Sequence, residues 1–236
     1  MAPRDPDAGI RRTITAGLLL AITLLLTLTR IGMIPVPTPA GNATIAHIPA
    51  ILGGIMEGPL VGLIVGLGFG FGSFMGATLP LFKDPLVAVA PRLLIGLVSA
   101  WVYIALRKAN RRTLTIMIGV LLLLLLAFSY QVGMTTLWLG IVAAVATVGV
   151  CVGLLIWLGK EEPGIIALAI ASSAGSLTNT VLVLAMATIR GFFSAEMAWT
   201  VGLTHGIPEA IVSAVVVVAV VSAVRQIGSR QRGSSI

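Results

Sequence analysis

Long runs of apolar residues follow one another along the whole chain, separated by short polar or proline-containing segments. A helix needs about 20 apolar residues to cross the hydrocarbon layer of a bilayer. The pattern predicts eight helices, over residues 13–33, 43–56, 60–76, 86–106, 114–130, 137–158, 165–189 and 199–224. The sequence therefore predicts an all-α polytopic membrane protein, in which the helix over 43–56 is short for a full span.

The segments between the helices carry residues that stop helices. Residues 34–42 contain three prolines, which lack an N–H group and favour an extended chain. Glu57-Gly58 predicts a tight turn, and Pro59 suits the first position of the next helix. That helix, over 60–76, holds six glycines. In lipid, glycines let neighbouring helix backbones approach closely.

Composition supports a membrane protein. The chain has 236 residues, of which 58% are hydrophobic and only 10% are charged, whereas soluble domains carry about 25% charged residues. Of its 15 Lys and Arg residues, 11 fall on loops facing one side and three on loops facing the other, with Arg92 inside a helix. Cytoplasmic loops collect positive charge, so both termini are expected in the cytoplasm. No basic stripe with aromatic residues occurs, which argues against nucleic-acid binding.

The start of the chain allows two interpretations. Arg11 and Arg12 precede an apolar run over 14–28, as in a signal peptide. No small-x-small cleavage site follows directly, so we expect a retained first helix. Within it, Gly17 and Ala21 form a small-xxx-small pattern that suits close packing against another helix, either in this chain or in a partner.

Motifs of common enzymes are missing. The only Gly-Lys pair, at Gly159-Lys160, is followed by Glu161 and does not complete a phosphate-binding loop. The two histidines, His47 and His205, lack the spacing of a metalloprotease helix, and no Gly-x-Ser-x-Gly motif occurs. We therefore expect no enzyme activity, no cofactor and no bound metal.

Polar and ionisable residues lie inside the predicted helices: Arg92, the run Thr178-Asn179-Thr180, His205 and Glu209. Such groups cost several kcal/mol in a membrane unless they are paired or hydrated, and they usually mark functional sites. His205 and Glu209 are four residues apart and share one helix face. With the termini inside, these groups and His47 all fall in the outer half of the bilayer, which predicts an outward-facing polar pocket.

Structural explanations stay open for each group. Arg92 is compatible with snorkelling toward Asp84 or a lipid headgroup, and Glu209 with an ion pair to Arg92. The run from Thr178 to Thr180 is compatible with hydrogen bonds between helices, each worth about 0.6 kcal/mol. The two histidines could equally anchor helix ends at the interface.

Five segments of the sequence resemble one known family. They are Ala46 to Gly54, Gly58 to Gly62, Pro91 to Leu97, Gly175 to Leu184 and Gly206 to Val212. Together they are similar to the substrate-binding S components of energy-coupling factor (ECF) vitamin transporters of prokaryotic plasma membranes. The resemblance implies a single transmembrane domain over 1–236, with a six-helix core (13–107 and 164–226) and an extra helical hairpin (113–159).

The resemblance also implies a function. An S component captures a vitamin or related small molecule from outside, here most similar to the pantothenate-like members, and works with a T component and two ATPase subunits. Gly17 and Ala21 match the positions that meet the T component, and residues 34–42 would cover the ligand. The substrate-binding residues expected are Asn42, His47, Arg92, Thr178, Asn179, His205 and Glu209. The alternatives are an ion-coupled secondary transporter and a structural membrane protein without a ligand.

Overall fold

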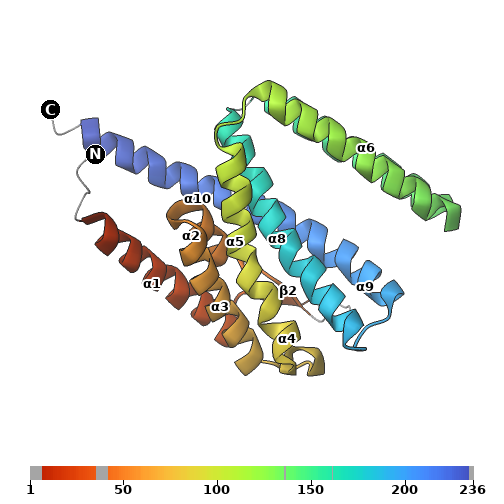
Figure 1. Ribbon diagram of the computed structural model, residues 1–236, viewed down its shortest axis with the longest axis horizontal. Helices are drawn as coiled ribbons and strands as arrows, with labels where there is room; N and C mark the ends of the chain where they lie inside the picture. Colours follow the sequence, from red (N-terminus) through yellow and green to blue (C-terminus); the bar gives the residue numbers. More distant parts are fainter. Residues whose placement is uncertain (1–6, 36–41, 136, 161, 234–236) are drawn as a thin grey trace. The chain divides into compact units, whose positions relative to one another are not determined.

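The protein is described by a computed structural model that covers residues 7–35, 42–135, 137–160 and 162–233. Its elements, in chain order, are α1 (Asp7–Leu28), β1 (Met33–Pro35), β2 (Asn42–Thr44), α2 (Ile48–Glu57), α3 (Pro59–Met75), η1 (Pro80–Lys83), α4 (Pro85–Ala88), α5 (Ala90–Leu106), α6 (Arg111–Thr135), α7 (Leu137–Lys160), α8 (Pro163–Ile189), α9 (Ala195–Val201), a π turn η2 (Gly202–Gly206) and α10 (Ile207–Gly233). Figure 1 shows that helices dominate.

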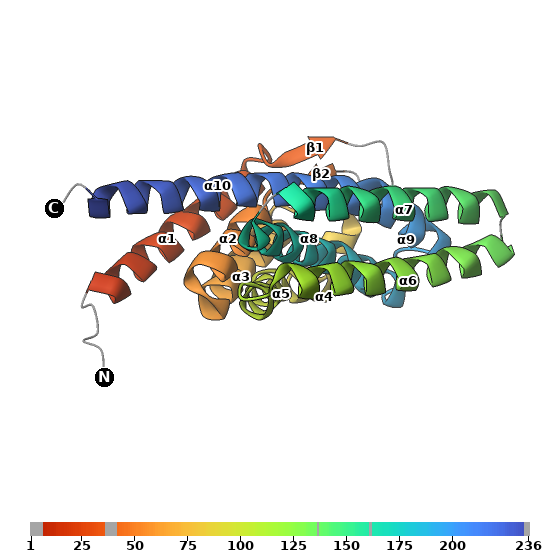
Figure 2. The same ribbon diagram turned by 90° about the horizontal axis from the view of Figure 1, so that it is seen from above.

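The described residues form two compact units. Residues up to Ile104 and from Leu168 onward make up the first unit, and residues from Ala105 to Ala167 make up the second. In the second unit, α6 and α7 lie side by side (Figure 2). At their ends, Arg111 donates a hydrogen bond of 3.1 Å to the carbonyl of Gly159.

Glycines determine how closely the helices of the first unit approach. A Cβ atom added to Gly62 of α3 would lie 2.8 Å from the Cα of Gly54 on α2 and 2.8 Å from the carbonyl of Gly96 on α5. Backbone therefore touches backbone where these three helices meet, as the glycine-rich sequence predicts. On the other side of α3, α1 packs against both α2 and α3.

The N-terminal boundaries differ from the prediction. The first helix ends at Leu28 rather than 33, because Arg30 adopts a left-handed φ of 61° and the N–H of Gly32 turns back to the carbonyl of Leu26. The chain then forms the antiparallel hairpin of β1 and β2, in which Met33 pairs with Thr44. The helix predicted over 43–56 was therefore wrong at its start, since its first residues belong to β2.

Two predicted helices are interrupted. The helix expected over 86–106 consists of α4 and α5, which meet at Val89, and the helix expected over 199–224 consists of α9, the π turn and α10. Each interruption lies just before a proline inside the apolar run, Pro91 or Pro208, whose missing N–H removes a helix hydrogen bond. The second run also begins earlier than expected, because Ser194 caps α9 by accepting a hydrogen bond from the N–H of Met197.

Four helical segments among the described residues are long and apolar enough to cross a membrane: Gly9–Leu28, Pro85–Leu106, Pro163–Ile189 and Ala195–Ile227. Two shorter apolar helices, Ile48–Glu57 and Pro59–Met75, lie between the first two of these segments. The fold is thus that of a helical, multi-pass membrane protein.

Candidate functional site

A cavity of about 60 Å³ lies within the first unit. Its walls come from the hairpin, from the end of α3, from the turn around η1 and from α5. They are formed by Met33, Asn42, Thr44, Phe69, Ser73, Gly76, Ala77, Thr78, Leu79, Phe82 and Arg92. This volume suits roughly four water molecules, whereas ligand pockets usually measure about 300–1,000 Å³. A vitamin-sized ligand therefore requires these walls to move apart.

Arg92 is the charged residue of the cavity wall, and its side chain is 4% exposed. Its guanidinium lies over the rings of Phe82 and Phe69, 4.9 Å and 5.5 Å from their centres. One Nη donates a hydrogen bond to the carbonyl of Val87. That carbonyl is available because Pro91, one turn later, has no N–H to donate to it. The Nε of Arg92 is buried and has no hydrogen-bond partner within the described structure, so one donor of this guanidinium is unused.

The backbone of Arg92 is fixed by α3. A Cβ added to Gly66 would collide with the Arg92 carbonyl oxygen and lie 3.2 Å from its carbonyl carbon. One turn further along α3, Gly70 touches Val89 in the same way. These glycines let α5 lie directly on α3, which holds Arg92 beside Phe69 and thus beside the cavity.

Glu209, near the start of α10, contacts the hairpin. Its carboxylate oxygen accepts a hydrogen bond of 2.6 Å from the backbone N–H of Thr44. Glu209 and Arg92 attract each other electrostatically, but within the described structure they form no direct ion pair. Each charge instead has its own nearby polar partner.

Both histidines are buried. His47 precedes α2, and its Nε2 lies 2.8 Å from the hydroxyl of Ser213 on α10. His205 belongs to the π turn, and its Nδ1 lies 3.2 Å from the hydroxyl of Thr204. Neither histidine is part of the cavity wall.

The polar run of α8 lies away from the cavity wall as well. Thr178 donates to the carbonyl of Ala174, one turn earlier in its own helix, at 2.7 Å. Asn179 is buried, and its Oδ1 has no hydrogen-bond partner among the described residues. Of the seven substrate-binding residues predicted, Asn42 and Arg92 line the cavity. The other five are not part of the cavity wall: His47, Thr178, Asn179, His205 and Glu209.

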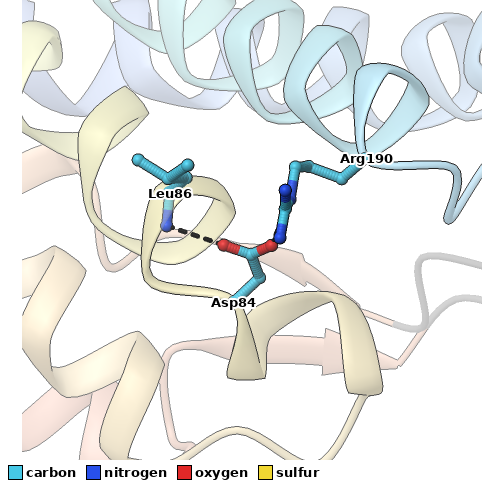
Figure 3. A network of polar contacts seen from close by, with 3 residues as sticks. All are labelled: Asp84, Leu86 and Arg190. Carbon is cyan, nitrogen blue, oxygen red and sulfur yellow. Dashed lines mark hydrogen bonds and ion pairs between the residues drawn. The ribbon is translucent and has the colours of Figure 1, made fainter.

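An ion pair joins α8 to the turn before α4. Figure 3 shows Asp84 accepting a hydrogen bond from the N–H of Leu86 at 2.9 Å and pairing with the Nε of Arg190 at 2.6 Å. The hydrogen bond from Arg190 lowers the pKa of Asp84 below its usual value. Because Asp84 pairs with Arg190 and Arg92 is buried against Val87, the alternative in which Arg92 snorkels to Asp84 is wrong.

The helix end that carries Arg190 has a well-defined cap. Gly191 adopts a left-handed φ of 77°, and the N–H groups of Gly191 and Phe192 return to the carbonyls of Thr188 and Ala187. This is the hydrogen-bond pattern of a Schellman motif. The cap directs Arg190 out of α8 toward Asp84.

Comparison with known families decides the membership. A sequence model described as "ECF transporter, substrate-specific component" matches residues 11–221, which is most of the chain. The chain belongs to this family. A search of curated proteins gave no significant match. The family match confirms the resemblance inferred from the sequence, and the protein is a transmembrane transporter subunit.

The geometry of this substrate-specific component includes residues that sequence reasoning missed. The missed cavity residues are Met33, Thr44, Phe69, Ser73 and Phe82, among others. Phe69 and Ser73 lie four residues apart and therefore on one helix face, and this spacing is the sequence signal that could have pointed to them. Thr44 and Met33 belong to a hairpin that apolar periodicity could not predict.

The residues expected to meet a T component lie on the surface of this substrate-specific component. Gly17 and Ala21 are both exposed on α1. A Cβ added to Gly17 would meet no atom within 4 Å. Gly17 and Ala21 therefore face outward from the first unit rather than into its packing.

Proposed function

We propose that this substrate-specific component captures a vitamin-like small molecule from outside and delivers it through a T component powered by two ATPase subunits. The observation that carries the proposal is the buried guanidinium of Arg92 at the cavity wall, with an Nε that lacks a partner in the described structure. A buried donor without a partner is costly, so a ligand that supplies the acceptor is stabilised there.

The substrate is expected to be pantothenate-like. A carboxylate or carbonyl oxygen of the ligand would accept from Arg92, and the amide of Asn42 would hydrogen-bond a second polar group. Phe69 and Phe82 offer apolar surface next to both. The five remaining predicted residues would join the site as its walls move apart: His47, Thr178, Asn179, His205 and Glu209.

The arrangement in the membrane follows from the same proposal. Eight spans place both termini in the cytoplasm of a prokaryotic cell. In both views the start of α1 and the end of α10 lie toward the same end of the first unit (Figures 1 and 2). The second unit adds α6 and α7, with 25 and 24 residues, and each is long enough to cross the bilayer.

Purified protein tests the capture step. We expect a small molecule to co-purify, identifiable by mass spectrometry, and pantothenate to be the first candidate in titration calorimetry. Arg92→Met keeps the length of the side chain and removes the donors, so it should weaken binding at least tenfold. Asn110→Ala, at a residue of the second unit that is outside the cavity wall, serves as control.

Reconstitution in vesicles tests the division of labour. The chain alone should bind its ligand without accumulating it, and ATP-dependent uptake should require the T component and the ATPases. Uptake by the chain alone, without ATP, would contradict the proposal and favour an ion-coupled secondary transporter.

A further inference from the structure

The β1–β2 hairpin forms one wall of the cavity, through Met33, Asn42 and Thr44. Each strand has only three residues. An isolated two-stranded hairpin is marginally stable at best. The position of this wall therefore depends on the contacts between the hairpin and the rest of the first unit.

Thr44 is where the hairpin is joined to the rest of the first unit. Its hydroxyl donates to the carbonyl of Gly32 at 3.2 Å and accepts from the N–H of Ala46 at 3.1 Å. Both partners are near Thr44 in the sequence. Its backbone N–H, in contrast, reaches Glu209, 165 residues further along the chain. This bond connects the hairpin directly to α10, and Figure 2 shows the two side by side.

The bond to Glu209 has the features of a strong contact. It is 2.6 Å long, and its acceptor is a carboxylate whose residue is 8% exposed. Hydrogen bonds to charged groups are stronger than neutral ones, and a low-dielectric surrounding strengthens them further. The π turn ends at Gly206 and α10 begins at Ile207, so Glu209 lies in the first turn of α10, directly after Pro208.

We propose that Glu209 is a positioning residue: its carboxylate anchors the hairpin wall of the pocket through the backbone N–H of Thr44. This inference rests on the proposed function for its meaning, since it gives Glu209 the role of holding the hairpin in place in the ligand-free protein, before the walls move apart. Glu209 is outside the cavity wall, whereas Thr44 is part of it. Ligand affinity then depends on Glu209 through the hairpin.

Hydrogen–deuterium exchange on the ligand-free, full-length protein in detergent tests the anchor. In Glu209→Ala the N–H of Thr44 loses its acceptor, so exchange in peptides covering 42–46 should rise on the order of tenfold to a hundredfold. Peptides from α3 should exchange as in the wild type. Glu209→Gln keeps an acceptor oxygen without the charge and should give an intermediate rate.

The matched control is Glu196→Ala, which removes a carboxylate from exposed Glu196 on the neighbouring α9. It should leave exchange in 42–46 unchanged. Unchanged exchange in Glu209→Ala, or an equal rise in the hairpin and in α3, would overturn the anchor. Since no ligand is added, these outcomes are independent of whether the proposed vitamin binding holds.

Discussion

The contact between α3 and α5 gives the sharpest test of how the sequence builds this site. Gly66→Ala adds one methyl group that collides with the Arg92 carbonyl oxygen and lies 3.5 Å from the Cα of Leu93. Both neighbours are helix backbone, so no side chain can rotate away, and the two helices must separate. Overpacking of this kind costs about 1–3 kcal/mol. For a unit of this size that corresponds to a melting temperature lower by roughly 2–12 °C.

Gly17→Ala is the matched control, because the same methyl group there meets no atom within 4 Å. An alanine in place of an exposed helical glycine stabilises by about 0.5–1 kcal/mol. Thermal unfolding followed by circular dichroism in detergent should therefore move in opposite directions for the two variants. Equal melting temperatures for wild type and Gly66→Ala would refute the argument that backbone contact positions Arg92.

Three further predictions follow from single contacts. Arg190 lowers the pKa of Asp84 in the folded protein. The pair therefore stabilises the folded protein at pH values above the unfolded-state pKa of about 4, and this stabilisation is lost as the pH falls through the lower pKa of the folded state. The melting temperature of Asp84→Asn should then lie below that of the wild type at neutral pH and approach it at low pH. A difference between the two proteins that stays constant with pH would contradict this. Arg92→Ala and Glu209→Ala should couple by about 0.5 kcal/mol or more in a double-mutant cycle of stability and ligand affinity, whereas strict additivity would show that the charges do not interact. Gly17→Leu should reduce co-purification with the T component without changing ligand affinity, and undiminished complex formation would place the docking surface elsewhere.

The sequence predicted the long apolar helices because the thickness of a bilayer fixes the number of apolar residues that a spanning helix needs, and such runs can be counted in the sequence. It also predicted the close packing of α3, since five glycines in one helix have few other uses in lipid. Short elements escaped prediction. The hairpin of β1 and β2 has three residues per strand, too few for an alternating pattern to stand out from the prolines around it.

The lid expected over 34–42 falls largely on residues 36–41, which lie outside the described residues. What the structure shows is the two strands that flank this segment, and both contribute to the cavity wall. The proline count predicted an extended chain there, and the strands agree with it at both ends. Only the hydrogen bond to Glu209 shows which part of the fold holds them, and nothing in the local sequence indicates a partner 165 residues away.

The charges inside the bundle show why depth along a helix is a weak guide to pairing. Counting residues placed Arg92 and Glu209 in the same half of the bilayer and left an ion pair between them open. In the structure each charge hydrogen-bonds a backbone group instead: Arg92 the Val87 carbonyl and Glu209 the Thr44 N–H. Both groups lie where regular structure is interrupted, one at a proline break and the other at the end of a strand. A charge in a low-dielectric interior needs hydrogen bonds as much as a counter-charge, and interruptions of the backbone supply them. Every residue has a backbone, so side-chain identity alone cannot predict such partners. A proline directly before a buried arginine, as in Pro91-Arg92, is nevertheless a sequence signal, because it leaves a carbonyl without its helix partner five residues before the arginine.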